Sequence, residues 1–122
     1  MRIARSGQTA LEPMATDTFS GAVRRRDFGR IGAPEGTAFA VTFEPGVRTH
    51  WHRHSNGQVL YVIKGSGRVG TRDGELAEIG VGDLVEAPPG EEHWHGASAH
   101  APMTHLALNF GETAWLDPVS DD

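Results

Sequence analysis

Short apolar runs separated by glycine and proline dominate the pattern of this chain. Residues 39–43 alternate large and small side chains with the period of two that a half-buried β-strand requires, and a Glu-Pro-Gly turn at 44–46 ends the run. Residues 59–63 are continuously β-branched, aromatic or aliphatic, which predicts a strand buried on both faces. Residues 103–110 form the last clear strand. The pattern predicts short strands along most of the chain and no segment with helix-length periodicity.

Turn signals recur every few residues between these runs. We expect Gly-Ser-Gly at 65–67 to turn the chain into a strand over 68–72, and the dipeptide Asp73-Gly74 to form a hairpin. Further turns are predicted at Gly82-Asp83 and at Pro-Pro-Gly over 88–90. Turns this frequent, without long helical segments, are typical of an all-β sandwich or closed barrel.

The two ends of the chain show no sustained alternation of hydrophobic and polar residues. We interpret residues 1–36 as an N-terminal arm with edge strands, including a weak strand at 19–27, residues 37–112 as the barrel core, and residues 113–122 as a C-terminal tail. A short helical turn is expected at 112–116. Because an exposed sheet edge favours unwanted pairing and such arms often pair with a neighbouring subunit, we expect a homodimer.

Length and composition fit one small domain. A chain of 122 residues buries roughly two-thirds of the surface that it exposes when unfolded, which leaves no room for a second independent core. The 16 glycines and 7 prolines agree with a turn-rich globular protein and argue against a helical bundle.

Charge and hydropathy narrow the range of partners. The net charge is −5, from 11 basic and 16 acidic side chains, and the longest basic run, residues 24–26, is followed at once by Asp27. This argues against nucleic acid and favours a small-molecule substrate. No apolar run is long enough to span a membrane, and polar residues 6–9 interrupt any signal-peptide core, so we expect no membrane partner and a cytoplasmic protein.

Histidines carry the candidate chemistry. The chain has no cysteine, so a metal site must use nitrogen and oxygen ligands. His50, His52 and His54 occupy alternate positions, so an extended segment directs all three to one face, with Gln58 at the same parity. Alternate residues lie about 6.6 Å apart, whereas His50 and His54 lie roughly 13 Å apart. The pattern therefore allows 50 with 52, or 52 with 54, to share an ion.

A third histidine has to come from another part of the chain. His93 and His95 are the next candidates, because the turn before them brings their hairpin across. A single histidine is more often an ordinary hydrogen-bonded residue than a metal ligand. Two alternating clusters in one small β domain favour the metal site, although periodicity alone leaves open which histidines bind.

The spacing of the motifs resembles that of the cupin superfamily. Gly46, His52, His54, Gln58 and Gly65 are separated by five, one, three and six residues, as in the first cupin motif, except that glutamine stands in place of the usual glutamate. Gly82, Pro88, Gly90 and His93 follow the second motif, whose usual asparagine falls on Ala97 and is missing.

The resemblance implies an all-β, single-domain cupin with an antiparallel barrel of the jelly-roll type. It also implies one central divalent metal ion held by His52, His54, Gln58 and His93, which selects the 52 and 54 pair. Four neutral ligands leave the ion its full charge and make it a stronger Lewis acid than a carboxylate-bound ion. We expect manganese, and the same ligands suit iron, nickel or zinc.

Three segments, 42–46, 89–97 and 103–107, are similar to small manganese-dependent cupins with hydroxynitrile lyase activity and their bacterial relatives. The resemblance implies a lyase in which the metal lowers the pKa of a substrate hydroxyl and a nearby base takes its proton. His105 is our first candidate for that base, and His95 the second. The alternative for His105 is a hydrogen-bonded histidine of the barrel.

Other aromatic and histidine residues receive structural interpretations. Trp51 and Trp94 have the opposite parity to the adjacent ligands, so they are expected to pack outside the ligand face. His50 is expected to flank the pocket entrance, and His100 to lie exposed in a loop of small residues.

Two other functions remain open at this point. One is an oxygenase in which iron or nickel binds dioxygen and a chelating substrate, and the other is a barrel that binds a small ligand without catalysis.

Overall fold

The computed structural model describes residues 5–14, 16–30 and 35–120. Within these ranges the chain forms strands and two short 3-10 helices, η1 (Ser6–Gln8) and η2 (Thr16–Thr18). The strands are β1 (Leu11–Pro13), β2 (Val23–Arg30), β3 (Gly36–Phe43), β4 (His52–His54), β5 (Gln58–Thr71), β6 (Leu76–Gly80), β7 (Leu84–Ala87), β8 (His93–Ala97), β9 (Met103–Phe110) and β10 (Thr113–Trp115). The predicted all-β class is confirmed. None of the helices described is long and apolar enough to cross a membrane.

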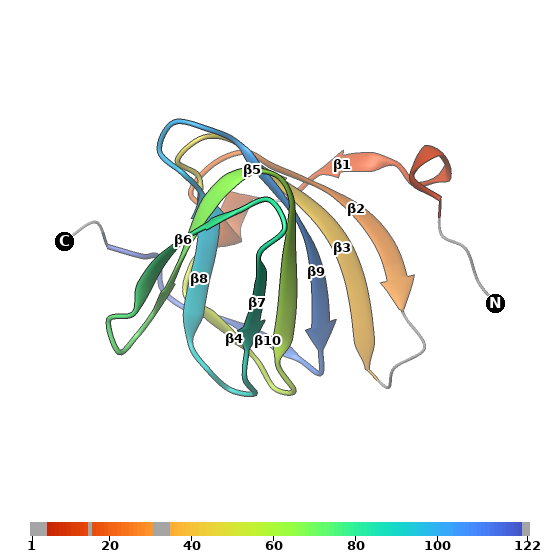
Figure 1. The fold of residues 1–122 in the computed structure, drawn as a ribbon. Helices are drawn as coiled ribbons and strands as arrows, with labels where there is room; N and C mark the ends of the chain where they lie inside the picture. The colour runs from red at the N-terminus through yellow and green to blue at the C-terminus, as the bar shows by residue number, and fades with distance from the viewer. Residues whose placement is uncertain (1–4, 15, 31–34, 121–122) are drawn as a thin grey trace.

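One antiparallel sheet contains all of these strands. Its order is β1-β2-β3-β9-β5-β8-β4-β10, and β6 and β7 pair with β5. Figure 1 shows that the sheet curls on itself, as a jelly-roll barrel does. Strands distant in sequence become neighbours through this curl, since β4 pairs with both β8 and β10.

Strand β5 bends where a turn was expected. The prediction that residues 65–67 end a strand is wrong, because β5 continues through them to Thr71. Gly65 has φ +78°, and a Cβ at this position would overlap the Pro102 carbonyl oxygen. Gly65 and Gly67 therefore allow β5 to bend. Residues 58–65 of this strand pair with β9, whereas residues 67–71 pair with β8.

The other sequence-based strand predictions fare better. Residues 39–43, 59–63 and 103–110 all lie in strands, and the Asp73-Gly74 hairpin joins β5 to β6. The prediction that 59–63 is buried on both faces is wrong, because Leu60 and Val62 are buried whereas Tyr61 and Ile63 are 43% and 48% exposed. The weak strand predicted at 19–27 begins only at Val23.

The helical turn expected at 112–116 is wrong, because residues 113–115 form β10. This strand pairs with β4 so that Thr113 lies opposite His54 and Trp115 lies opposite His52. Pairing with the open edge of β4 satisfies backbone groups that an isolated helical turn of this length would leave largely unpaired.

The hydrophobic core lies beside the histidines. It consists of Phe19, Val23, Val41, Phe43, Val62, Ile79, Ala97 and Met103. The fully buried ring of Phe43 packs edge-on against Phe19, with 6.0 Å between centroids. The same ring lies 5.7 Å from the His95 ring and 5.4 Å from the His105 ring. The apolar core thus forms one wall of the candidate site.

Candidate metal centre

Strand alternation gathers the histidines on the inner face of the sheet. His52 and His54 of β4 are 1% and 3% exposed, whereas Arg53 between them points outward to solvent. His93 lies opposite His52 on β8 and is also buried. The parity argument is therefore confirmed for the positions of these side chains.

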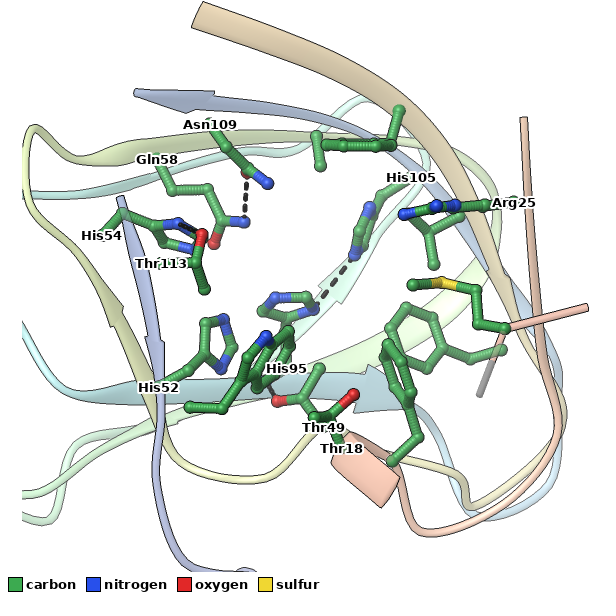
Figure 2. A pocket seen from close by; sticks show the side chains of 17 residues that line it. Thr18, Arg25, Thr49, His52, His54, Gln58, His95, His105, Asn109 and Thr113 are labelled. Atoms are coloured by element: carbon green, nitrogen blue, oxygen red, sulfur yellow. Dashed lines mark hydrogen bonds between the residues drawn. The ribbon is translucent and has the colours of Figure 1, made fainter. Parts of the chain in front are cut away.

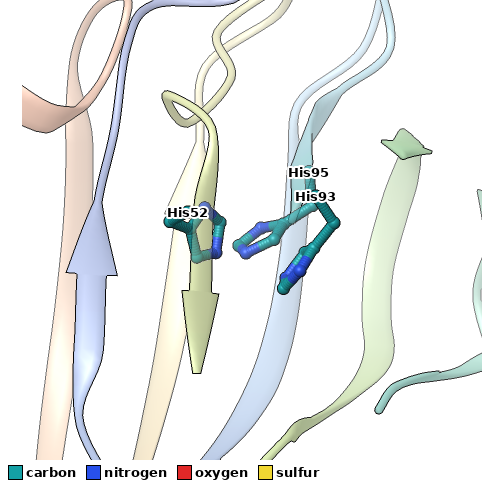
Figure 3. Close-up of side chains that lie close together, drawn as sticks. All are labelled: His52, His93 and His95. Carbon is teal, nitrogen blue, oxygen red and sulfur yellow. The ribbon is translucent and has the colours of Figure 1, made fainter. Parts of the chain in front are cut away.

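Three imidazoles approach one another most closely. Candidate ligand nitrogens of His52, His93 and His95 all lie within 4.8 Å of one another, and Figure 3 shows the three rings lying close together between β4 and β8. Two nitrogens on one ion, with bonds of about 2.1 Å, lie at most roughly 4.2 Å apart. Small side-chain adjustments would close the three rings on an ion.

Backbone carbonyls orient two of the rings. Nδ1 of His52 donates to the carbonyl oxygen of His50 at 2.9 Å, and Nδ1 of His93 donates to that of Glu91 at 3.0 Å. A neutral imidazole has one N–H, so each Nε2 keeps a free lone pair. Metal-binding histidines in proteins are held in this way.

The contact between Gln58 and His93 calls for a cation. The Gln58 amide nitrogen donates to Oδ1 of Asn109 at 2.7 Å, which leaves Oε1 2.8 Å from Nε2 of His93. Both atoms are acceptors, because the single N–H of a neutral His93 is already donated to Glu91. A metal ion between them would turn this repulsion into two ligand bonds, so the residues present fit a divalent metal.

His54 has the same arrangement through a side chain. Its Nδ1 is 2.9 Å from the Thr113 hydroxyl, and its buried Nε2 has no hydrogen-bond partner among the described residues. Buried polar atoms are rarely left unpaired, so an unpaired ring nitrogen suggests a missing ligand.

A second histidine pair lies deeper in the site. Nε2 of His105 and Nδ1 of His95 are 3.0 Å apart, and the remaining ring nitrogens, His105 Nδ1 and His95 Nε2, have no partner within the described part of the chain. One ring must donate to the other. Whichever ring donates, one of the two remaining nitrogens carries a proton and the other carries a lone pair.

Burial keeps these histidines neutral. It lowers the pKa of His105 to about 4, and burial together with the nearby His93 lowers the pKa of His54 to about 4. Burial is also the main cause that lowers the pKa values of His52 and His95 well below 6.5 and lowers the pKa of His93. Their lone pairs are available to a cation at neutral pH.

His52, His54, His95 and His105 open onto a cavity of about 210 Å3 (Figure 2). At roughly 30 Å3 per water molecule, this volume corresponds to about seven waters, which suits a small metabolite. Apolar walls and a few polar groups line it, as is usual for ligand sites. The lining residues are Met14, Thr18, Phe19, Arg25, Phe39, Val41, Phe43, Thr49, His52, His54, Gln58, His95, His105, Ala107, Asn109, Thr113 and Trp115.

The four residues given structural interpretations from the sequence lie outside the cavity: Trp51, Trp94, His50 and His100. Trp51 and Trp94 lie outside the cavity, as predicted, beneath arginine side chains whose Cζ atoms are 4.3 to 5.6 Å from their ring centroids. His100 is exposed, as predicted. His50 does not line the cavity and contributes its carbonyl group instead.

Arg25, Asn109, Thr113 and Trp115 are among the cavity-lining residues that sequence reasoning missed. The ring of Trp115 lies 4.6 Å from that of His52 and covers it on the β10 side. Asn109 could have been found, because period-two alternation along 103–110 places it on the same face as His105. Thr113 and Trp115 were missed because residues 113–115 were not predicted to form a strand.

Comparisons with known proteins agree with this architecture. A family model described as "Cupin domain" matches residues 39–109. The chain is 42% identical to an (R)-mandelonitrile lyase of Granulicella tundricola over 127 residues, which cover 100% of this chain and 97% of the relative. It is 36% identical over 62 residues to a gentisate 1,2-dioxygenase of a Ralstonia species, covering 51% of this chain and 18% of that enzyme.

A solved cupin-like protein of Thermotoga maritima superposes with a TM-score of 0.85 at 32% identity, covering 93% of this chain and 91% of that one. The family match spans more than half of the chain, and the similarity to the lyase extends over its full length. The chain belongs to the cupin family.

Proposed function

We propose that this cupin is a metal-dependent lyase acting on a small hydroxyl or carbonyl compound. The contact between Oε1 of Gln58 and Nε2 of His93 supports the proposal, because with the Gln58 amide donating to Asn109 two lone pairs face each other at 2.8 Å, an arrangement that a cation would stabilise. The full-length similarity to an (R)-mandelonitrile lyase supports the reaction class.

In this proposal His52, His54, Gln58 and His93 hold the ion. Each histidine offers Nε2, while its Nδ1 is fixed by a carbonyl or hydroxyl group. Manganese is the proposed metal. The 2.8 Å between Gln58 and His93 is close to the roughly 3.0 Å expected between adjacent ligands of an octahedral ion with 2.1 Å bonds.

A divalent ion bound by four neutral ligands supplies Lewis acidity, which lowers the pKa of a hydroxyl group. The His95 and His105 pair accepts and donates protons. The free lone pair of one ring accepts the substrate proton, while the N–H at the other end of the pair can be given up. Burial lowers the pKa values of both rings, so both are neutral and ready to accept a proton at neutral pH.

The test combines metal analysis with an assay. Protein purified without added metal is expected to contain about one manganese per chain and to release cyanide from mandelonitrile. His52→Ala is expected to lose both the metal and the activity, and His105→Gln to keep the metal and lose activity by about a hundredfold or more. Stoichiometric metal retained in His52→Ala would contradict the ligand assignment.

An oxygenase is the second candidate, because half of the chain is 36% identical to a gentisate 1,2-dioxygenase. Under this alternative the protein holds iron, and oxygen uptake accompanies substrate loss. Manganese content together with cyanide release that proceeds equally well without oxygen would favour the lyase.

A further inference from the structure

Arg25 places a positive charge inside a cavity that is otherwise lined by neutral groups. Strand β2 directs Arg25 to the same face as buried Val23, and the exposed Arg24 to the opposite face. In register, Arg25 lies opposite Val41 of β3, and Val41 lies opposite His105 of β9. Figure 2 shows the guanidinium directed from β2 into the cavity, on the side of His105.

Arg25 forms no ion pair within the described residues, although Glu12 of β1 lies opposite it in register. The Arg25 side chain packs against the Phe39 ring, whose centroid lies 5.2 Å from Cζ. The ion pairs of the described residues do not include it, and no aspartate or glutamate lines the cavity. Arg24, by contrast, lies 3.7 Å from Glu44 on the outer surface.

A guanidinium has five N–H donors, and no carboxylate among the cavity-lining residues accepts from the one that Arg25 places there. Partial removal of its water costs free energy that only a charged or strongly polar partner restores. The partner that matches its planar, paired donors is a carboxylate. The buried histidines cannot take this role, because burial keeps them neutral and they offer no negative charge.

We propose that Arg25 binds a carboxylate group of the substrate, so that the preferred ligands are small hydroxy or oxo acids. The acid group lies at Arg25 and the hydroxyl or carbonyl oxygen lies toward His52 and Gln58. Phe39 and Val41 contact the carbon skeleton between them. The reaction at the oxygen rests on the proposed lyase function, whereas the carboxylate contact at Arg25 does not.

The consequence is a distinction between acids and their neutral analogues. Mandelonitrile and other uncharged cyanohydrins leave the guanidinium without a partner. They serve as assay substrates, and they bind more weakly than acids of similar size.

The experiment measures binding by titration calorimetry with two matched pairs, mandelate against mandelamide and lactate against lactamide. Each pair has nearly the same shape and differs in charge. We expect at least one acid to bind the manganese-loaded protein about tenfold or more tightly than its amide. Arg25→Gln should abolish this preference, Arg25→Lys should retain part of it, and the control Arg24→Gln should leave it unchanged.

Each outcome is decisive. A preference for the acid that survives in Arg25→Gln would assign the carboxylate to the metal and overturn the proposal, as would the absence of any preference in both pairs. Repeating the titration without metal isolates the arginine contact. If the acid preference depends on Arg25 while cyanide release fails, the lyase function falls and the carboxylate site stands.

Discussion

In the proposed metal site, Gln58 is the ligand that decides how much charge the ion keeps. Its amide nitrogen is committed to Asn109, which directs the oxygen to His93 without adding negative charge. A carboxylate in this place would bind a cation more strongly and also neutralise part of its charge. Replacing the amide by a carboxylate should therefore raise the affinity for the metal and lower the Lewis acidity of the bound ion.

Gln58→Glu tests this directly. The variant should hold manganese at least as tightly as the parent protein, while the rate of cyanide release falls by about tenfold or more. Metal competition titrations measure the first quantity and steady-state assays the second. A variant that binds manganese more weakly, or that releases cyanide at an unchanged rate, would contradict the role given to the neutral amide.

Buried neutral histidines also make stability depend on pH. In the unfolded chain a histidine has a pKa of about 6.5, whereas the pKa values of His54 and His105 in the folded protein are about 4. Above about pH 6.5 the rings are neutral in both states. Between 6.5 and 4 the unfolded chain takes up protons that the folded chain cannot, so stability falls as pH falls.

Urea unfolding of the metal-free protein at several pH values measures this effect. A fully buried group such as His105 contributes up to about 1.4 kcal/mol per pH unit. His105→Asn should flatten the dependence, and substitution of the exposed His100 should not. A free energy of unfolding that rises on acidification would refute the assignment of neutral buried rings.

The sequence could predict the residues whose position depends on local alternation. His52 and His54 share a face because they are two residues apart on one strand, and no long-range information is needed for that. Asn109 and Thr113 reach the site only because β9 and β10 pair with strands distant in sequence. In the sequence Arg25 is one residue of the basic run 24–26, and the sequence does not show that β2 pairs with β3 and brings Arg25 opposite Val41.

At the level of elements, the bend in β5 distinguishes a glycine that ends a strand from one that bends it. Gly65 and Gly74 both have positive φ, yet a Cβ on Gly74 would meet open space, whereas one on Gly65 would overlap the Pro102 carbonyl group. A Gly-Ser-Gly sequence fits either outcome. The close approach of residues 102–103 to Gly65 decides whether the strand ends or bends there, and the sequence around Gly65 carries no signal for this long-range contact.

Alanine substitutions separate the two effects. Gly74→Ala should cost about 1–2 kcal/mol of unfolding free energy from backbone strain alone. Gly65→Ala should cost about 1–3 kcal/mol more, because the new methyl group displaces packed backbone. Chemical denaturation of both variants measures the difference, and equal losses would contradict the close approach at Gly65.

Strand β10 provides a test of which histidine completes the metal site. Thr113→Val keeps the shape of the side chain and removes the hydroxyl that holds Nδ1 of His54. If His54 is a ligand, affinity for manganese should fall about tenfold or more, as is typical when an outer-shell partner is lost.

The control for this variant is Thr42→Val, whose hydroxyl pairs with that of Thr104 at 2.9 Å and does not line the cavity. It should leave metal affinity unchanged. Unchanged affinity in Thr113→Val as well would instead favour His95 as the third imidazole, since His95 lies within 4.8 Å of the other two.

For the whole molecule, frequent turns and two spaced motifs were enough to predict the family and the all-β class, because both depend on local sequence signals. The homodimer and the cytoplasmic location stay predictions. The arm expected to reach a neighbouring subunit contains β1, which pairs within its own chain with β2. Sedimentation at micromolar concentration should give twice the mass of one chain if the homodimer exists.

The position of Trp115 gives the molecule an internal optical signal. Of its three tryptophans, Trp115 lines the cavity beside His52, whereas Trp51 and Trp94 lie outside it against arginine side chains. Emission from Trp115 should therefore change when an ion or a ligand arrives, over a steady background from the other two. Trp115→Phe would remove the response, so every titration described above can be followed by fluorescence in the unlabelled protein.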